Sequence, residues 1–195
     1  MKIARYAFIA ATFALSLPAI AEEHRELGPH EHGVGRLNIA VEGKRVSMEL
    51  EVPGADIVGF EQEASTEEQK AAVSKAKNTL KGALKVFELP AEAKCRLAEA
   101  KVAIDAEDHD HDAAGHEGAK HEGGEEEGHH SEFHATYAID CTAPEKLTGI
   151  QFRYFELFAG ARKLDINLVT EKGQNHYEVT RESPKLEFGE IGRGD

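Results

Sequence analysis

Between Asp108 and His134 the chain reads DHDHDAAGHEGAKHEGGEEEGHHSEFH. This stretch holds seven of the eleven histidines, and most of the residues between them are carboxylates and glycines. No large apolar residue precedes Phe133, so the stretch cannot bury enough surface to offset the entropy lost on ordering. We therefore expect residues 106–132 to form a flexible loop that interrupts the fold.

The composition of this loop indicates metal binding. Imidazoles and carboxylates bind borderline divalent metals, and glycine spacers let several of them converge on one ion. We predict zinc, with copper and nickel as alternatives because they bind the same donors, and with a solvated acidic linker as the competing interpretation. Histidine binds metal only when neutral, so metal should be released below about pH 6. The predicted ligands here are His109, Asp110, His111, His116, His121, His129, His130 and His134.

A second group of histidines lies upstream. His30 and His32 are two residues apart, so in an extended segment both imidazoles point to the same side, and both are predicted ligands. Glu61 is a candidate partner for them, although the sequence favours a surface carboxylate beside a buried Phe60. His176 falls on a predicted strand and is interpreted as structural.

The first 21 residues predict a secretory signal peptide. Lys2 and Arg5 give a positive start, Tyr6 to Leu17 is a short apolar run, and Ala19-Ile20-Ala21 matches a cleavage site. The apolar run is too short to span a membrane as a stable helix. We expect an exported protein, residues 22–195, with no membrane insertion after cleavage.

Charge and cysteine content narrow the function further. A formal net charge of −13 argues against nucleic-acid binding and favours attraction of cations. Two cysteines in an exported chain suggest a disulfide, which would tie the base of the loop. A cysteine metal site is the alternative, but neither Cys95 nor Cys141 has the CxxC or CxH spacing.

The segments before the loop predict a hairpin and a helix. Residues 34–40 and 45–52 alternate apolar and polar side chains, which is typical of half-buried strands. Residues 65–87 predict a long helix with one apolar face, which would cover a sheet. Ser65 and Glu68 fit a capping box at its start.

The cysteines flank two further strands. Residues 95–105 and 133–141 should pair antiparallel with Cys95 opposite Cys141, which places Ile104 near Glu132. Thr142 is a candidate helix cap. Residues 149–158 suit either a strand or a helix, and we favour a short strand followed by a helical turn. Strands around residues 164–168 and 177–179 complete an α+β domain with a mostly antiparallel sheet, one long covering helix and a disordered His-rich hairpin insert; two halves split near the loop are the alternative.

Motifs that would indicate catalysis are missing from the sequence. It contains no HExxH and no nucleophile elbow, so we predict a binding protein and no enzyme. The solute-binding component of a metal importer is an alternative, but such proteins need two larger α/β lobes, for which this chain is too short.

Several short motifs occur in a characteristic order: PHEHGVGRLNIAVEG from Pro29 to Gly43, Pro53, GFE from Gly59 to Glu61, AKC ending at Cys95, and the acidic His-rich insert before Cys141. In these motifs the chain resembles the ZrgA-like family of periplasmic zinc-binding proteins, which are linked to zinc acquisition in Gram-negative bacteria. The resemblance implies a periplasmic zinc-binding protein that captures or buffers zinc and assists uptake, with a zinc ABC importer as partner. It implies ligands among the insert histidines and at His30 and His32. Where a histidine is expected after GFE, this chain has Gln62.

Overall fold

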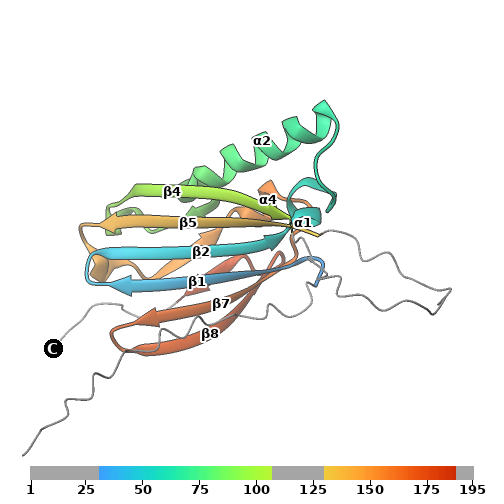
Figure 1. The fold of residues 1–195 in the computed structure, drawn as a ribbon. Coiled ribbons are helices and arrows are strands. Elements are labelled where there is room, and N and C mark those ends of the chain that lie inside the picture. Colours follow the sequence, from blue (N-terminus) through green and yellow to red (C-terminus); the bar gives the residue numbers. More distant parts are fainter. Residues whose placement is uncertain (1–30, 107–129, 188–195) are drawn as a thin grey trace, which may run out of the picture.

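The computed structural model of the protein describes residues 31–106 and 130–187 (Figure 1). The expected signal peptide, His30 and the predicted ligands His109, Asp110, His111, His116, His121 and His129 lie outside the described residues. The described residues form the predicted α+β fold, with a six-stranded sheet, a three-stranded sheet and one helix of 15 residues. None of the helices in these ranges is long and apolar enough to cross a bilayer.

The large sheet is mostly antiparallel, as predicted. The one parallel contact joins β1 (Val34–Glu42) to β7 (Lys163–Thr170), and every other neighbouring pair is antiparallel. The predicted hairpin of β1 and β2 (Arg45–Pro53) is confirmed. In spatial order the strands are β4 (Cys95–Ala106), β5 (Ser131–Cys141), β2 (Arg45–Pro53), β1 (Val34–Glu42), β7 (Lys163–Thr170) and β8 (Gly173–Thr180).

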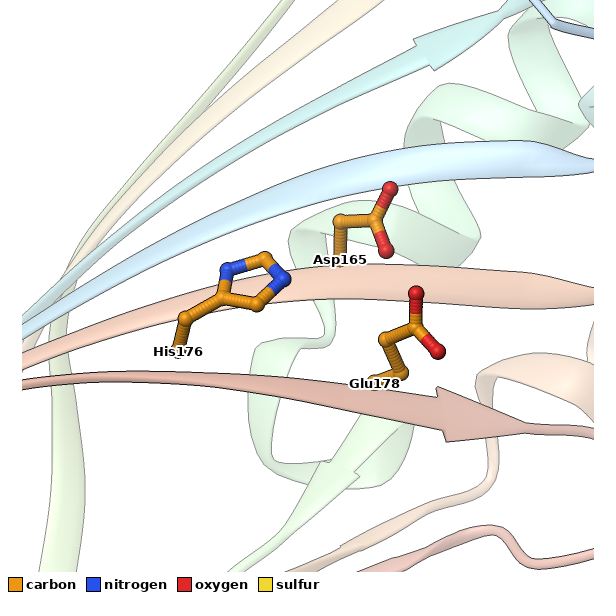
Figure 2. Close-up of side chains that lie close together, drawn as sticks. All are labelled: Asp165, His176 and Glu178. Atoms are coloured by element: carbon orange, nitrogen blue, oxygen red, sulfur yellow. The ribbon is translucent and has the colours of Figure 1, made fainter.

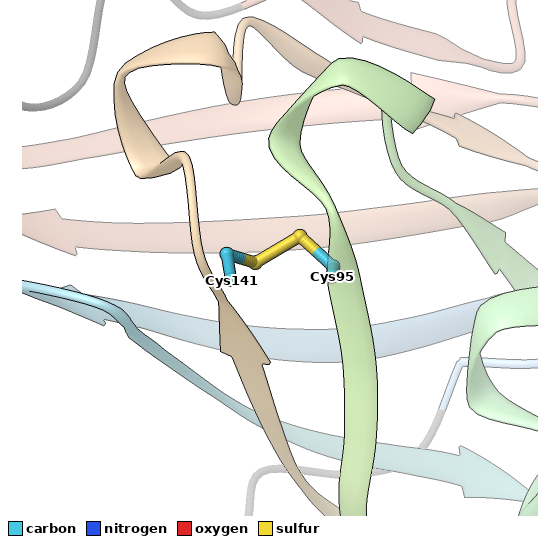
Figure 3. Close-up of a disulfide and its surroundings, with 2 residues drawn as sticks. All are labelled: Cys95 and Cys141. Carbon is cyan, nitrogen blue, oxygen red and sulfur yellow. A yellow bond between two sulfur atoms is a disulfide. The ribbon is translucent and has the colours of Figure 1, made fainter.

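The predicted disulfide between Cys95 and Cys141 is present, and the two residues face each other across β4 and β5 (Figure 3). The predicted pairing of Cys95 opposite Cys141 is confirmed. The bond lies where β4 begins and β5 ends, at the far end of the hairpin from the insert, so it does not tie the base of the loop as expected. A bulge between Leu97 and Glu99 shifts the register by one residue. Ile104 therefore lies opposite Phe133, one residue from Glu132, near which it was predicted.

The covering helix is shorter than predicted. Helix α2 (Glu67–Lys81) ends at Gly82, whose ψ of 50° is not helical, and a separate turn α3 (Ala83–Val86) follows. Glycine is a poor helix former, which explains the break. The capping box is displaced by one residue from the prediction: the Thr66 hydroxyl accepts from the Gln69 amide, and the Gln69 side chain accepts from the Thr66 amide.

Short elements complete the fold, and the sequence did not reveal α1, β3 and β9. Helix α1 (Gly54–Val58) follows β2 directly, and a small sheet joins β3 (Phe87–Glu88), β6 (Gly149–Phe152) and β9 (Lys185–Glu187). The predicted strand and helical turn are confirmed as β6 and α4 (Tyr154–Leu157). The predicted capped helix at Thr142 is wrong: the segment forms a single 3₁₀ turn, η2 (Pro144–Lys146), without a side-chain cap. A similar turn, η1 (Ala91–Ala93), precedes β4.

The core lies between the large sheet and the elements that cover one of its faces. Alternate side chains of the central strands point into it, among them Leu37, Leu50 and Ile166, which are all fully buried. From the small sheet, the Phe87 ring packs against Tyr137 of β5, with ring centroids 5.8 Å apart. Figure 1 shows α2 along the β4 side of the sheet. The opposite face of the large sheet is therefore left for polar side chains.

One end of the large sheet brings together segments that are distant in the sequence. Pairing of Pro53 with Glu132 and of Val34 with Lys163 places the end of β2 and the starts of β1, β5 and β7 together. Ala106 and His130, the described residues on either side of residues 107–129, also lie at this end. We call this the insert end of the sheet.

Candidate metal centre

At the insert end, one carboxylate contacts two imidazoles. Glu61 Oε1 lies 3.1 Å from Nδ1 of His32, and Glu61 Oε2 lies 2.6 Å from Nδ1 of His130. His32 precedes β1 and His130 precedes β5, while Glu61 follows α1, so three distant parts of the chain meet. The Glu61 side chain is 20% exposed, and the imidazoles are 68% and 49% exposed. The carboxylate is thus partly sheltered while both rings remain accessible.

The backbone holds this group in place. The carbonyl of Glu61 accepts from the amide of Ser131, next to His130, at 2.9 Å. Gly33, next to His32, donates its amide to both oxygens of Asp56 at 2.8 and 2.9 Å. Gly33 has a φ of 87°, which favours glycine, and a Cβ there would lie 2.9 Å from the Arg162 side chain. The backbone conformation and the close Arg162 side chain therefore favour glycine at this position of the HEHG motif.

Asp56 adds a second negative group behind Glu61. The side chain belongs to α1 and is buried. Burial raises the pKa of the Asp56 carboxyl, opposed by the Gly33 hydrogen bond and the nearby His32 and Arg162, while the charge of Glu61 raises it further. Two carboxylates thus lie close enough to influence each other, which favours a cation at this end of the sheet.

The contacts with Glu61 favour one ring nitrogen of each histidine for metal binding. An ionised carboxylate can only accept, so Nδ1 of His130, which hydrogen-bonds Glu61 Oε2, carries the proton when this ring is neutral. The ion-pair contact of His32 Nδ1 with Glu61 Oε1 favours the same tautomer for His32. Each Nε2 then keeps its lone pair. Histidine ligands of metals commonly have a carboxylate on the other nitrogen, which orients the ring and makes it more basic. The pair offers two nitrogen donors to zinc, which takes four ligands.

His134 lies apart from this pair, on β5. Its Nε2 is 3.0 Å from Glu132 Oε2 and 3.7 Å from Asp105 Oδ2 of β4. The hydrogen bond with Glu132 raises the pKa of His134; partial burial opposes this, and the charges of Glu132, Asp105 and Glu51 add to it. This is a one-imidazole group with two carboxylates, close to where the insert joins β4 and β5.

The structure thus divides the described members of the predicted ligand set. It brings His32 and His130 together on Glu61, and it places His134 with other carboxylates. The sequence had favoured a surface role for Glu61, and the structure instead places it between two imidazoles despite Gln62 after it. The GFE motif was the available signal. His176 lies on β8, as expected for a strand residue, with Nδ1 3.1 Å from Asn167 Oδ1.

Comparison with known proteins identifies the family. A family model described as "ZrgA family zinc uptake protein" matches residues 29–188, which include all ten predicted ligands and Glu61. No curated protein matches the chain. The matched family serves zinc uptake and is not a family of enzymes. Because the match covers most of the chain, this protein belongs to the ZrgA family of zinc uptake proteins.

Proposed function

We propose that this protein captures zinc in the periplasm and buffers it for uptake. The contact of Glu61 with both His32 and His130 is the observation that carries the proposal. It supplies two oriented nitrogen donors where the histidine-rich insert joins the fold. Membership of a zinc uptake family and a disulfide, which is typical of oxidising compartments, support the metal and the location.

The division of ligands suggests how capture works. His32 and His130 are held by the folded domain, whereas the insert supplies His109, Asp110, His111, His116, His121 and His129. His30 precedes the anchored pair. A set with more donors than one ion needs allows ligands to replace one another, so zinc can move without being fully released. We propose that this exchange serves delivery to a zinc importer.

The test compares Glu61→Gln with Glu63→Gln in direct zinc titrations. Glutamine keeps the shape of Glu61 but offers one acceptor oxygen in place of two, so one of the two imidazoles loses its Nδ1 contact with a carboxylate oxygen. Loss of such an orienting carboxylate should weaken zinc binding by about 10- to 100-fold. Glu63 is exposed, and its substitution removes the same charge nearby. The proposal fails if the two variants bind zinc equally well.

A second comparison separates the anchored pair from the insert. Removal of residues 108–129 should lower the number of zinc ions bound while the Glu61-dependent binding remains. Copper and nickel should be titrated in parallel, because copper binds imidazole donors more tightly in the general affinity order. Metal bound by protein purified from the periplasm without an affinity tag then identifies the ion held in the cell; protein that carries copper or nickel in place of zinc would refute the zinc assignment.

A further inference from the structure

A second group of metal-binding side chains lies on β7 and β8. Asp165, His176 and Glu178 each offer one donor atom, and these atoms lie within 4.8 Å of one another (Figure 2). Asp165 and Glu178 face each other in the antiparallel register. His176 is two residues from Glu178, so its side chain is on the same face of β8. Strand geometry alone therefore brings the three together.

The imidazole is oriented by neutral groups. Asn167 Nδ2 donates to Asn38 Oδ1 at 3.0 Å, which turns Asn167 Oδ1 toward Nδ1 of His176, 3.1 Å away. An amide oxygen only accepts, so Nδ1 carries the proton and Nε2 keeps its lone pair. Figure 2 shows the far nitrogen of the ring directed toward the two carboxylates. A ring held in this way by its other nitrogen is typical of histidine metal ligands.

A positive charge already lies between the carboxylates. Lys163 Nζ is 3.1 Å from Asp165 Oδ1 and 3.3 Å from Glu178 Oε1. Among the described residues, Asp165 Oδ1 is shielded from solvent and accepts no hydrogen bond of good geometry, so the ammonium compensates its charge by proximity. The arrangement attracts a cation, and a metal ion at this position must displace the flexible lysine side chain.

From these contacts we propose that Asp165, His176 and Glu178 form a second zinc site, in which Lys163 competes with the metal. Zinc accepts one imidazole and two carboxylates as ligands, with water in the fourth position. Competition from the ammonium makes this site weaker and its exchange faster than a site without the lysine. β7 begins and β8 ends at the insert end, so the second site and the Glu61 group share one end of the sheet.

Zinc chloride titrated into the full mature chain tests the site, with NMR observation of the His176 ring and counting of bound ions by native mass spectrometry. The His176 resonances should shift on zinc addition. His176→Gln should remove one zinc ion from the count, and Lys163→Met should raise the affinity of this site by about tenfold. Glu178→Gln should also weaken zinc binding at this site. Its charge control is Glu171→Gln, which changes an exposed carboxylate in the turn between β7 and β8 and should leave the site unchanged.

Two outcomes would overturn the proposal. The first is that the His176 resonances do not shift when zinc is added. The second is a Lys163→Met variant that has native circular dichroism and unchanged zinc affinity. The Glu61→Gln background keeps this test separate from the proposed capture site. There the His176 shift should persist, since neither the insert nor Glu61 contributes to the second site. A shift that vanishes in Glu61→Gln would mean that the ring reports the first group, which also refutes the independent site.

Discussion

At the scale of single residues, His134 links acidity to stability. Its pKa is raised, first by the hydrogen bond with Glu132. The folded protein therefore binds the proton more tightly than the unfolded chain does. The stabilising contribution is fully present below the unfolded pKa of about 6.5 and is lost as pH rises through the folded value.

His134→Gln should therefore destabilise the metal-free protein in a pH-dependent way. We expect a loss of about 0.5–1 kcal/mol at pH 5.5, as for a partly exposed ion pair, and little loss at pH 8.5. Urea unfolding in the presence of a chelator measures both values. An equal loss at the two pH values would show that the charge of His134 has no part in its stabilising contacts.

At the scale of elements, two neighbouring hydroxyls at the start of α2 should contribute differently to stability. The Thr66 hydroxyl accepts from the Gln69 amide, which has no partner within the first helical turn. Thr66→Ala should cost about 1 kcal/mol. Ser65→Ala is the matched control and should cost less, because the Ser65 hydroxyl donates to the half-buried Gln69 side chain and does not accept from a helix amide. Thermal unfolding of both variants is the measurement, and a larger loss for Ser65→Ala would contradict the assignment of the cap.

Removal of the disulfide in the β4–β5 hairpin should lower the stability of the protein without changing its zinc affinity. The disulfide joins residues 46 apart, and its removal in a Cys95→Ser, Cys141→Ser variant should cost about 4 kcal/mol on the chain-entropy model. Twelve residues of β4 span about 35 Å between the disulfide and the insert end. Zinc affinity under native conditions should therefore be unchanged. An affinity that falls along with the unfolding midpoint would show that the bond also orders the metal centre.

At the scale of the whole molecule, local patterns predicted pairs of neighbours better than distant contacts. Alternation in residues 34–52 correctly predicted the β1–β2 hairpin, because its register follows from the turn. Nothing local pairs β1 with β7, which lies more than a hundred residues away in the sequence and runs parallel to it. The two- and three-residue strands β3 and β9 are likewise too short to show periodicity.

In the candidate metal centre, too, the sequence predicted the residue types but not the contacts between distant residues. Residue types and spacing identified His32 and His130 as ligand candidates, but the sequence separates each of them from Glu61 by many residues. Only packing of α1 against the start of β5 places Glu61 between them. The contribution of Asp56 could not be predicted from the sequence either, because it depends on the hydrogen bonds that the Gly33 amide donates to the buried Asp56 carboxylate.

This dependence on packing predicts a remote effect from Gly160. A Cβ at this position would lie 2.6 Å from the Cα and 2.7 Å from the carbonyl oxygen of Asp56, so Gly160→Ala must displace α1. Overpacking of this kind costs about 1–3 kcal/mol. Movement of Asp56 also disturbs its hydrogen bonds to Gly33, and with them the position of His32. Gly160→Ala should therefore lower both the unfolding midpoint and the zinc affinity that depends on Glu61.

The control for this effect is Gly43→Asn in the turn between β1 and β2, at the other end of the sheet. A Cβ there meets no atom within 4 Å, and asparagine tolerates its φ of 54°. It should leave zinc affinity unchanged. The prediction is contradicted if Gly160→Ala lowers stability but leaves zinc affinity unchanged. In that case the rings of His32 and His130 keep their positions when α1 is displaced, and the contact with Glu61 alone orients them.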